Sequence, residues 1–479
     1  MFHNLFVPAL PKRCIPIMPE TRKIALFIAL LAGFLTPFDL SAVNIALPSI
    51  SGEFSMNAIE MGWVASAYLL ASAVFLLPFG RIADIYGRKK IFTGGLFIFT
   101  LASVLMIFST SSMMVILVRL LQGFGGAMIF GTAVAILTSV TPAQERGRAL
   151  GIYTTAVYFG LSTGPFFGGI LTDYLGWRSI FLVNIPIGVF TIAMILLFLK
   201  DEWADCCGEP FDTGGAIRYG LGLVCVMYGF SLLPGTAGFV LLIAGSAILV
   251  WFVVKELSID YPLLDIALFT KNRVFAFSNL AALINYSATF AVTFFLSLYL
   301  QYVRDFTPQH AGMLLVVQPV VQALFSPAAG RLSDRMEPGR IASAGMALTA
   351  LGLILLLTAD ASTPLAMFIL ILVILGAGLG LFSSPNTNAI MSSVDRKKYG
   401  VASGTLGTMR LVGQMFSMGI AMMILAIYIG DVQITESLYP AFIGSMRICF
   451  GIFAVLCIAG VFLSLVRHTP VPAPINNSP

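Results

Sequence analysis

The chain alternates between long apolar runs and short polar segments over almost its whole length. A membrane-spanning helix needs about 20 predominantly apolar residues, so each run of that length predicts one span. Fourteen runs qualify, at 24–48, 59–79, 90–109, 113–139, 148–172, 179–199, 214–233, 237–254, 273–300, 311–331, 340–358, 364–389, 402–428 and 443–466. The pattern predicts an all-α polytopic membrane protein with fourteen transmembrane helices.

The basic residues of the polar segments predict the orientation of these spans. If the fourteen spans alternate in direction, 22 of the 27 Lys and Arg residues fall on the side that carries both termini. The segments of the other side hold only Arg178 and Arg304, whereas Arg119, Arg410 and Arg447 lie within spans. Cytoplasmic loops are rich in Lys and Arg. We therefore expect a multi-pass protein of the cell (plasma) membrane with both termini in the cytoplasm.

The composition agrees with a membrane protein and excludes most other classes. Apolar residues make up 58% of the 479 residues and charged ones only 10%, whereas soluble domains carry about 25% charged residues. Most soluble enzymes, nucleic-acid binders and disordered regulators are thereby excluded. The net charge of +5 reflects topology rather than an anionic partner. The six cysteines show no CxxC spacing, so neither a disulfide framework nor a metal site is expected.

One polar segment occurs twice. Gly80-Arg-Ile-Ala-Asp84-Ile-Tyr-Gly87-Arg88 follows the second span, and a weaker copy, Gly330-Arg-Leu-Ser-Asp334, follows the span at 311–331. Each copy follows the second span of its own half if the two spans within 214–254 are set aside. Internal repeats of this kind mark transporter folds in which two related halves surround a midplane site. A basic cytoplasmic loop alone would explain the charges but not the repeated Gly and Asp spacing.

The repeat divides the chain into five parts. We expect a cytoplasmic N-terminal extension at 1–20, a six-helix half at 21–200, a linker with two additional helices at 201–272, a second six-helix half at 273–467 and a disordered, proline-rich tail at 468–479. The extension lacks the apolar stretch of a signal peptide, and translation can start at Met1 or Met18.

Several motifs in order resemble the Major Facilitator Superfamily, specifically its fourteen-span drug:proton antiporter branch, over almost all of 20–468. The matching stretches are Asp39-Leu-Ser-Ala-Val-Asn44-Ile-Ala-Leu-Pro48, the loop Gly80–Lys90, Arg119-Leu-Leu-Gln122-Gly123, the glycines of the fifth span, and Trp177-Arg178 through Asn184 to Gly188. The resemblance implies two six-helix halves plus two extra central helices. It also implies a secondary active transporter that exports lipophilic or cationic drugs in exchange for protons by alternating access.

Asp39 and Arg119 are the candidate proton-coupling residues. Asp39 is the one carboxylate that we place deep in a predicted span, and an ionisable group there is costly unless it is paired or functional. At 1.5 Å per residue, Asp39 lies about 15 Å and Arg119 about 10 Å below the same face, so the two can meet. A change in their separation would change the proton affinity of Asp39. A static ion pair that joins two helices is the alternative.

Two further groups have roles implied by the resemblance. Gly160, Gly164 and Gly168 recur every four residues beside Pro165 and Gly169, and this face would seal the central path or simply allow close helix packing. The repeated loops would act as a conformational gate, with Asp84 near a helix N-terminus of the other half, where the dipole favours a carboxylate. The gate residues are Gly80, Asp84, Gly87, Arg88 and Asp334.

Mid-span polar and aromatic residues are candidates for the substrate cavity: Asn44, Gln122, Tyr158, Asn285, Tyr286, Gln318 and Gln322. Residues of this kind also serve as interhelical contacts. With one deep carboxylate, monovalent lipophilic cations would be attracted and held by aromatic faces. The expected partners are therefore a small amphipathic or cationic substrate, protons and the bilayer.

Other functions fit the sequence less well. A carrier for a defined metabolite or siderophore would share the fold. A polytopic membrane enzyme would need a cluster of polar side chains, yet His3, His310 and His468 are scattered and no HExxH occurs. Nothing dedicated to signalling points to a sensor. No GxxxxGK[ST] is present, so ATP drive is not expected, and neither is any cofactor.

Overall fold

The computed structural model describes residues 19–142, 145–204, 206–395 and 398–465. Within these ranges the regular structure is helical throughout. Most of the predicted N-terminal extension and the whole tail at 468–479 lie outside the described residues, as do Met1 and Met18.

The first eight helices are α1 (Pro19–Phe54), α2 (Ala58–Tyr86), α3 (Arg88–Ile107), α4 (Ser112–Val140), α5 (Arg146–Leu175), α6 (Arg178–Phe198), α7 (Thr213–Ser231) and α8 (Thr236–Glu256). After the short α9 (Ile266–Lys271) come α10 (Arg273–Leu298), which continues as a π-helix at Tyr299–Val303, then α11 (Pro308–Leu315), α12 (Val317–Ser333), α13 (Pro338–Leu356), α14 (Leu365–Ser392), α15 (Tyr399–Tyr428) and α16 (Tyr439–Leu465). Each predicted apolar run overlaps a helix.

Helix ends follow local chemistry. The side chain of Asn57 accepts from the backbone N–H of Glu60 at 2.7 Å, and the Glu60 carboxylate accepts from the Asn57 N–H at 3.1 Å, so a capping box begins α2. Asn272 accepts from the N–H of Phe275 at 3.0 Å and caps α10 in the same way. These caps satisfy N–H groups that the helices themselves leave free.

Twelve helices within the described residues are long and apolar enough to cross a membrane, so the predicted count of fourteen spans is not confirmed. The two predicted spans that fall short are α5 and α7. Both are rich in glycine, and α7 also contains Arg218. Small residues let helices approach closely, but they also lower the mean hydropathy of α5 and α7, which is the property by which spans are recognised.

The helices form two bundles with equivalent internal packing. In the first, α2 and α3 pack on α4, and α1 packs on α5 and α6. In the second, α12 and α13 pack on α14, and α10 packs on α15 and α16. The helices α7 and α8 pack on each other, and α7 also contacts α2 and α15, so this hairpin covers the seam between the bundles.

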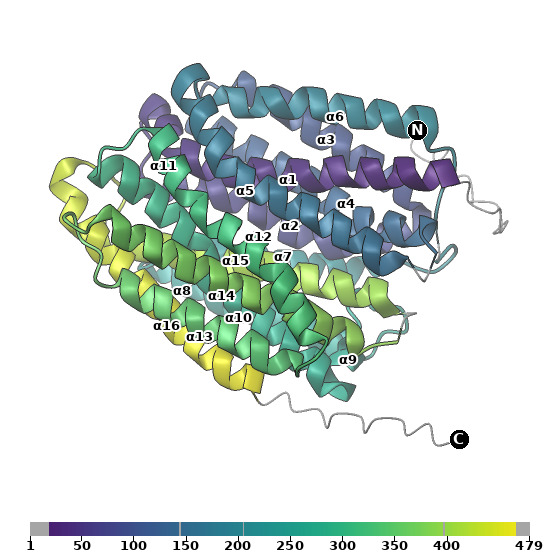
Figure 1. The fold of residues 1–479 in the computed structure, drawn as a ribbon. Helices are drawn as coiled ribbons and strands as arrows, with labels where there is room; N and C mark the ends of the chain where they lie inside the picture. Colours follow the sequence, from purple (N-terminus) through teal and green to yellow (C-terminus); the bar gives the residue numbers. More distant parts are fainter. Residues whose placement is uncertain (1–18, 143–144, 205, 396–397, 466–479) are drawn as a thin grey trace.

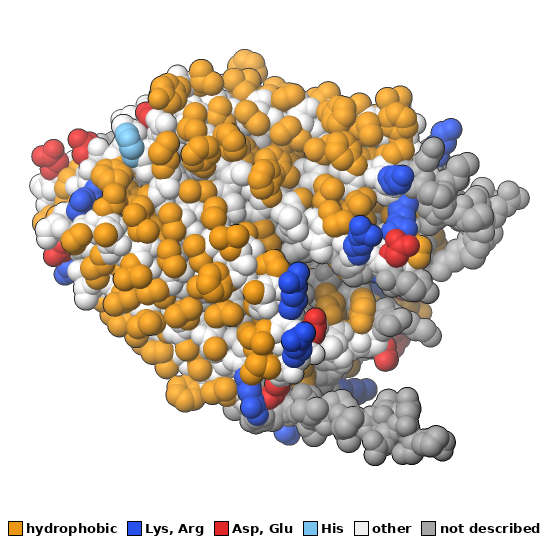
Figure 2. Space-filling view, viewed as in Figure 1, with side chains coloured by type: hydrophobic (Ala, Val, Ile, Leu, Met, Phe, Trp, Pro, Cys, Tyr) orange, Lys and Arg blue, Asp and Glu red, His pale blue; other side chains and the backbone are white. Residues whose placement is uncertain are grey.

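The first helix begins and the last helix ends at the same end of the molecule, here called the terminal end (Figure 1). Side chains over the middle of the visible face are mainly apolar, and Lys and Arg gather toward the terminal end (Figure 2). Large apolar side chains such as Phe239, Ile243 and Trp251 of α8 are exposed. An apolar girdle of this kind is the surface that a bilayer covers.

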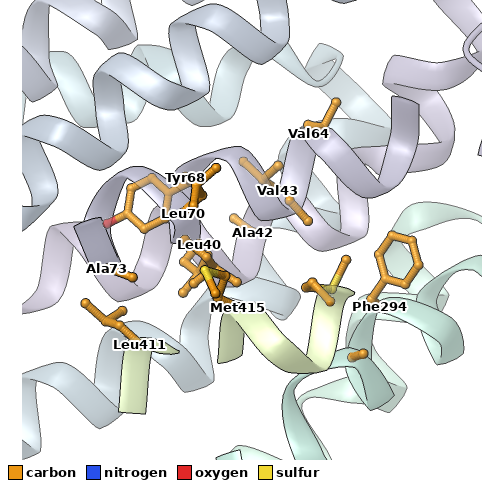
Figure 3. Close-up of a cluster of buried hydrophobic side chains, with 14 of the residues drawn as sticks. Leu40, Ala42, Val43, Val64, Tyr68, Leu70, Ala73, Phe294, Leu411 and Met415 are labelled. Atoms are coloured by element: carbon orange, nitrogen blue, oxygen red, sulfur yellow. The ribbon is translucent and has the colours of Figure 1, made fainter. Parts of the chain in front are cut away.

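An apolar core joins the two bundles. Figure 3 shows part of it, with Leu40 of α1 and Tyr68 of α2 in the same cluster as Phe294 of α10 and Met415 of α15. Two polar contacts between the bundles lie toward the opposite end: Ser297 donates to the Asn44 carbonyl at 2.7 Å, and Gln301 donates to the Ile45 carbonyl at 3.0 Å. At the terminal end the surface is set back between the bundles (Figure 2).

Candidate functional site

A buried ionic network surrounds Asp39, midway along α1. The carboxylate is fully buried. Arg119 of α4 donates to Oδ2 at 2.5 Å, and Asn184 of α6 donates to Oδ1 at 2.7 Å. Gln122, one turn beyond Arg119, donates to Oδ1 at 3.4 Å. Three donors from two helices therefore converge on one carboxylate, and such bonds stabilise its charged form.

Arg119 is itself fully buried and held by several groups. Its Nε donates to the Val64 carbonyl at 3.2 Å, and its Nη1 also donates to Gln122 Oε1 at 2.8 Å. The guanidinium carbon lies 4.7 Å from the centre of the Tyr68 ring, a cation–π distance. Its Nη2 has no hydrogen-bond partner among the described residues. The guanidinium is thus fixed against α2 while one of its nitrogens lacks a partner.

The network changes its charge balance if Asp39 takes up a proton. The ionised pair is neutral overall, and that neutrality is what makes burial of two charges tolerable. Protonation of Asp39 would leave the Arg119 charge without its counterion and weaken the bonds from Asn184 and Gln122. The arrangement can therefore convert a proton into a change in how α1 is held against α4 and α6.

A second feature is a cavity between the two bundles, with about 710 Å³ of empty space when its open mouth is included. Helices α1, α5, α10, α11, α12, α14 and α15 contribute to its wall. The polar lining comprises Ser41, Asn44, Tyr286, Thr289, Thr293, Gln318, Gln322, Arg410 and Gln414. The apolar lining comprises Leu40, Leu161, Pro165, Phe290, Leu315, Pro319 and Leu379. A concave wall that combines apolar side chains with polar groups able to orient a ligand is typical of small-molecule sites.

Four of the seven residues predicted for the cavity line it, namely Asn44, Tyr286, Gln318 and Gln322. Gln122 belongs instead to the Asp39 network.

The other two predicted cavity residues lie elsewhere. Tyr158 donates to Ser383 Oγ at 3.1 Å and so links α5 to α14. Asn285 is fully buried, and neither amide atom of its side chain has a partner among the described residues.

Sequence reasoning missed residues in both places. Asn184 was noted only as part of a motif, and Tyr68 was not singled out, although both touch the ionic pair. Arg410 was noted as an arginine within a span, but its place in the cavity was not foreseen. The available signal was its charge at mid-span, since such residues mark functional sites by default.

The glycines of α5 pack against the helix that carries Asp39. A Cβ on Gly160 would lie 2.4 Å from the Phe34 carbonyl oxygen, and one on Gly168 would lie 2.8 Å from the Cα of Ala42. A Cβ on Gly164 would collide with the Ser41 hydroxyl. Gly169 faces the other bundle, where a Cβ would lie 2.5 Å from the Pro308 carbonyl oxygen. These contacts leave no room for side chains.

The family model of the Major Facilitator Superfamily matches residues 29–205 and 278–479. The chain belongs to this superfamily. It is accordingly a multi-pass membrane protein of a transporter family. The match is interrupted across 206–277, a stretch that contains α7, α8 and α9.

Relatives in the superfamily include exporters and a vitamin transporter. The riboflavin transporter RibZ of Clostridioides difficile is 32% identical, with 83% of this chain and 86% of that protein covered. The cephamycin export protein CmcT of Amycolatopsis lactamdurans is 32% identical, with 96% of each chain covered. The multidrug resistance protein Stp of Mycobacterium tuberculosis is 28% identical over 86% of this chain and 77% of that protein.

Two solved transporter structures share the fold of this chain. A bacterial homologue of the human lysosomal transporter Spinster, in an inward-facing and unoccupied conformation, superposes with a TM-score of 0.67 at 16% identity, covering 94% of this chain and 97% of that one. The nucleoside transporter NupG gives a TM-score of 0.62 at 13% identity, with coverage of 94% and 100%.

The signature loop of the superfamily bonds to its own bundle and to the segment after α6 here. Asp84 accepts from Arg88 Nε at 2.8 Å, and Arg88 Nη1 donates to Ser139 at the end of α4 at 2.6 Å. Among the described residues, no hydrogen bond joins Asp84 to the second bundle. In the weaker copy, Asn388 of α14 donates to Asp334 at 3.4 Å. Gly80 has open space where a Cβ would lie.

The segment after α6 forms hydrogen bonds with this loop. Glu202 accepts from the backbone N–H of Lys89 at 2.8 Å and of Lys90 at 3.2 Å, so a carboxylate from another segment caps the start of α3. Burial raises the pKa of Glu202, and the bonds from Lys89 and Trp203 oppose that rise. Gly87 has a φ of +124°, and a Cβ there would lie 2.6 Å from the Glu202 carboxyl carbon. Glycine is therefore required at this position.

Proposed function

We propose that the protein exports amphipathic small molecules in exchange for protons by alternating access. The observation that carries the proposal is the placement of two sites on one helix. Asp39 faces the buried network, whereas Leu40, Ser41 and Asn44 of the same turns of α1 line the cavity. Asp39 itself is not part of the cavity wall. Proton and substrate therefore act on α1 from different faces, and coupling passes through the position of this helix.

The charge state of Asp39 would determine how α1 is held. When Asp39 is ionised, Arg119 and Asn184 hold α1 against α4 and α6. When it is protonated, the ion pair is lost and α1 can shift relative to α4, which alters the cavity wall. A ligand drives such a change only by its different affinity for the two states. The proton supplies that difference at Asp39, and the substrate supplies it at the cavity.

Charge and packing support a specific topology. We propose fourteen spans, with α5 and α7 crossing the bilayer although their composition is less apolar than that of the other helices. The domain limits 21–200, 201–272 and 273–467 are part of this proposal, and the interruption of the family match within 206–277 supports the additional pair. The Lys and Arg residues at the terminal end support a cytoplasmic location of both termini.

In this topology the cavity is sealed from outside and faces the cytoplasm. The signature loop then acts as a gate that is open in the observed state. Its Asp84 is paired with Arg88 and is available to meet the second bundle when the cytoplasmic side closes. Glu202 keeps the loop in place throughout.

The relatives support export but also suggest a second candidate. The cephamycin exporter and the multidrug resistance protein favour expulsion of bioactive compounds. The similarity to a riboflavin transporter favours a carrier for one defined metabolite. Efflux assays with several unrelated dyes, and with riboflavin as a separate probe, distinguish them, because a carrier for a single metabolite would move only one of these compounds.

The test of proton coupling is Asp39→Asn in proteoliposomes with an imposed pH gradient. The amide cannot exchange a proton, so we expect gradient-driven dye transport to fall to background while dye binding persists. Because loss of one partner of a buried pair costs about 3–5 kcal/mol, the double variant Asp39→Asn/Arg119→Gln is measured in parallel. Asp260→Asn, an exposed loop substitution, is the matched control. Undiminished gradient-driven transport by folded Asp39→Asn would refute proton coupling at this residue.

A further inference from the structure

The central cavity carries a positive charge and no negative one. Among the residues that the structure describes, Arg410 of α15 is the only Asp, Glu, Lys, Arg or His in its wall. No carboxylate among the described residues lies within ion-pair distance of Arg410. Asp39 does not compensate it, because that carboxylate is fully buried and paired with Arg119. The expectation of a cationic substrate assumed a carboxylate at the cavity, and this geometry does not supply one.

Arg410 lies deep in the molecule. It is eleven residues from the start of α15, or about 16 Å along the helix at 1.5 Å per residue. Its guanidinium carbon lies 5.2 Å from the centre of the Tyr286 ring, and Tyr286 in turn makes an edge contact with Phe382. The stacked ring orients the guanidinium but does not neutralise it. An arginine at such depth is costly unless water or an anion meets it, and the cavity is where either can do so.

Unused hydrogen-bonding groups accompany this charge. Gln414 lies one helical turn from Arg410, and Gln318 and Gln322 lie one turn apart on α12. None of these three amide groups forms a side-chain hydrogen bond within the described part of the chain. The Oδ1 atom of Asn44 is buried and also without a partner there. Polar groups in such a wall cost free energy unless water or a ligand satisfies them.

We propose that the cavity selects amphipathic organic anions. A carboxylate, sulfonate or phenolate group would be bound by Arg410, with Gln414 and the two glutamines of α12 completing its hydrogen bonds. The planar guanidinium suits a carboxylate because two parallel N–H···O bonds can form. The ring system of the substrate would lie against Phe290 and the apolar residues Leu40, Leu161 and Leu379. This proposal rests on the proposed export function and defines its substrate class.

The test is a binding titration on the full-length protein in nanodiscs, with two dyes that share a xanthene ring system. Fluorescein is anionic at neutral pH and rhodamine 123 is cationic. We expect the wild type to bind fluorescein more tightly. Arg410→Gln should weaken fluorescein binding roughly tenfold, since a hydrogen bond to a charged group contributes about 1.5–3 kcal/mol. Rhodamine 123 should bind the variant no more weakly, and Arg410→Lys should retain part of the anion preference.

Matched controls separate the cavity charge from net charge. Arg340→Gln removes one positive charge from an exposed side chain outside the cavity, and we expect it to leave both affinities unchanged. A competition experiment on the wild type alone tests the proposal even if Arg410→Gln does not fold. In the wild type, 1-naphthoate should displace bound fluorescein more effectively than 1-naphthylmethylamine, which has the same ring and the opposite charge.

Two outcomes overturn the proposal: a wild type that prefers rhodamine 123 or is displaced equally by both naphthyl compounds, and a folded Arg410→Gln variant with unchanged fluorescein affinity. Neither outcome bears on whether a pH gradient drives transport. Conversely, a protein that binds fluorescein through Arg410 but moves no dye in response to a pH gradient would contradict the proposed function while leaving the anion site intact.

Discussion

At the residue scale, Asp39 is held by partners that lie far apart in the sequence. Its donors come from α4 and α6, and the Tyr68 ring of α2 supports Arg119. Hydrogen bonds to a buried carboxylate stabilise the position of the helix that carries it. If Asp39 couples transport to protons as proposed, we expect each of these donors to control transport.

Asn184→Leu tests this control. The substitution removes the 2.7 Å donation to Asp39 without removing either charge. The carboxylate loses its hydrogen bond from α6, so α1 is held less firmly against that helix. We expect gradient-driven dye transport to fall roughly tenfold, since a hydrogen bond to a charged group contributes about 1.5–3 kcal/mol.

Asn279→Leu is the control for the same chemical change. Asn279 is buried in α10, and its side chain donates to the Phe275 carbonyl of its own helix at 2.9 Å. Its replacement should leave the transport rate unchanged. An Asn184→Leu variant that transports dye at the wild-type rate would show that this donor does not influence transport.

The sequence identified the charged members of the sites more readily than their neutral partners. Asp39 and Arg119 stand out because charges in apolar runs are rare and costly. Asn184 and Tyr68 do not, and Gln122 was assigned to the cavity, because neutral polar residues are frequent in spans and serve many contacts. Whether such a residue faces the network or the cavity depends on the rotation of its helix, which the pattern of the span alone did not determine.

At the element scale, the pairing of α1 with α5 connects the helix that carries Asp39 to the wall of the cavity. The four-residue glycine repeat predicted that some helix approaches α5 closely, and it does. That this helix is α1, which bears Asp39, was not deducible from spacing, because contacts distant in sequence depend on the whole bundle. Likewise, nothing in the sequence after α6 indicated that Glu202 would cap α3.

Gly160→Ala should disrupt the pairing of α1 and α5. The new Cβ would lie 2.4 Å from the Phe34 carbonyl oxygen, which is backbone and cannot rotate away. Overpacking of this kind costs about 1–3 kcal/mol. We expect a lower thermal unfolding temperature and loss of gradient-driven transport, measured by fluorescence-detected unfolding and by dye efflux.

Gly151→Ala on the same helix is the matched control, because nothing lies within 4 Å of a Cβ at that position. It should behave like the wild type in both assays. Equal behaviour of the two variants would mean that α1 and α5 have room to separate, and the close pairing would then have no part in coupling.

At the scale of the whole molecule, the two bundles meet toward the end opposite to the termini. Gly312 of α11 packs on the Pro165 carbonyl of α5, and the backbone N–H of Ala58 donates to the Val432 carbonyl at 3.2 Å. The two-bundle division was predictable from the repeated loop, because each copy marks the same place in its half. The end at which the bundles meet was not predictable, since both states of an alternating-access cycle share one sequence.

Gly312→Ala should shift the balance between these states. Its Cβ would lie 2.1 Å from the Pro165 carbonyl oxygen, so the bundles cannot approach as closely at the opposite end. The observed state loses about 1–3 kcal/mol by overpacking, whereas a state that is open at that end loses nothing. The ratio of the two populations should therefore change roughly tenfold or more toward the open state.

Spin labels on exposed residues at that end measure this change. Thr110 lies between α3 and α4 of the first bundle, and Ser437 precedes α16 of the second. The distance between labels attached to Thr110→Cys and Ser437→Cys therefore reports the separation of the bundles. In a background without native cysteines, the distance distribution of Gly312→Ala should gain a longer component. Gly52→Ala, where a Cβ meets nothing within 4 Å, should leave the distribution unchanged. If folded Gly312→Ala gave the wild-type distribution, the contact of α11 with α5 would not be what holds the two bundles together at this end.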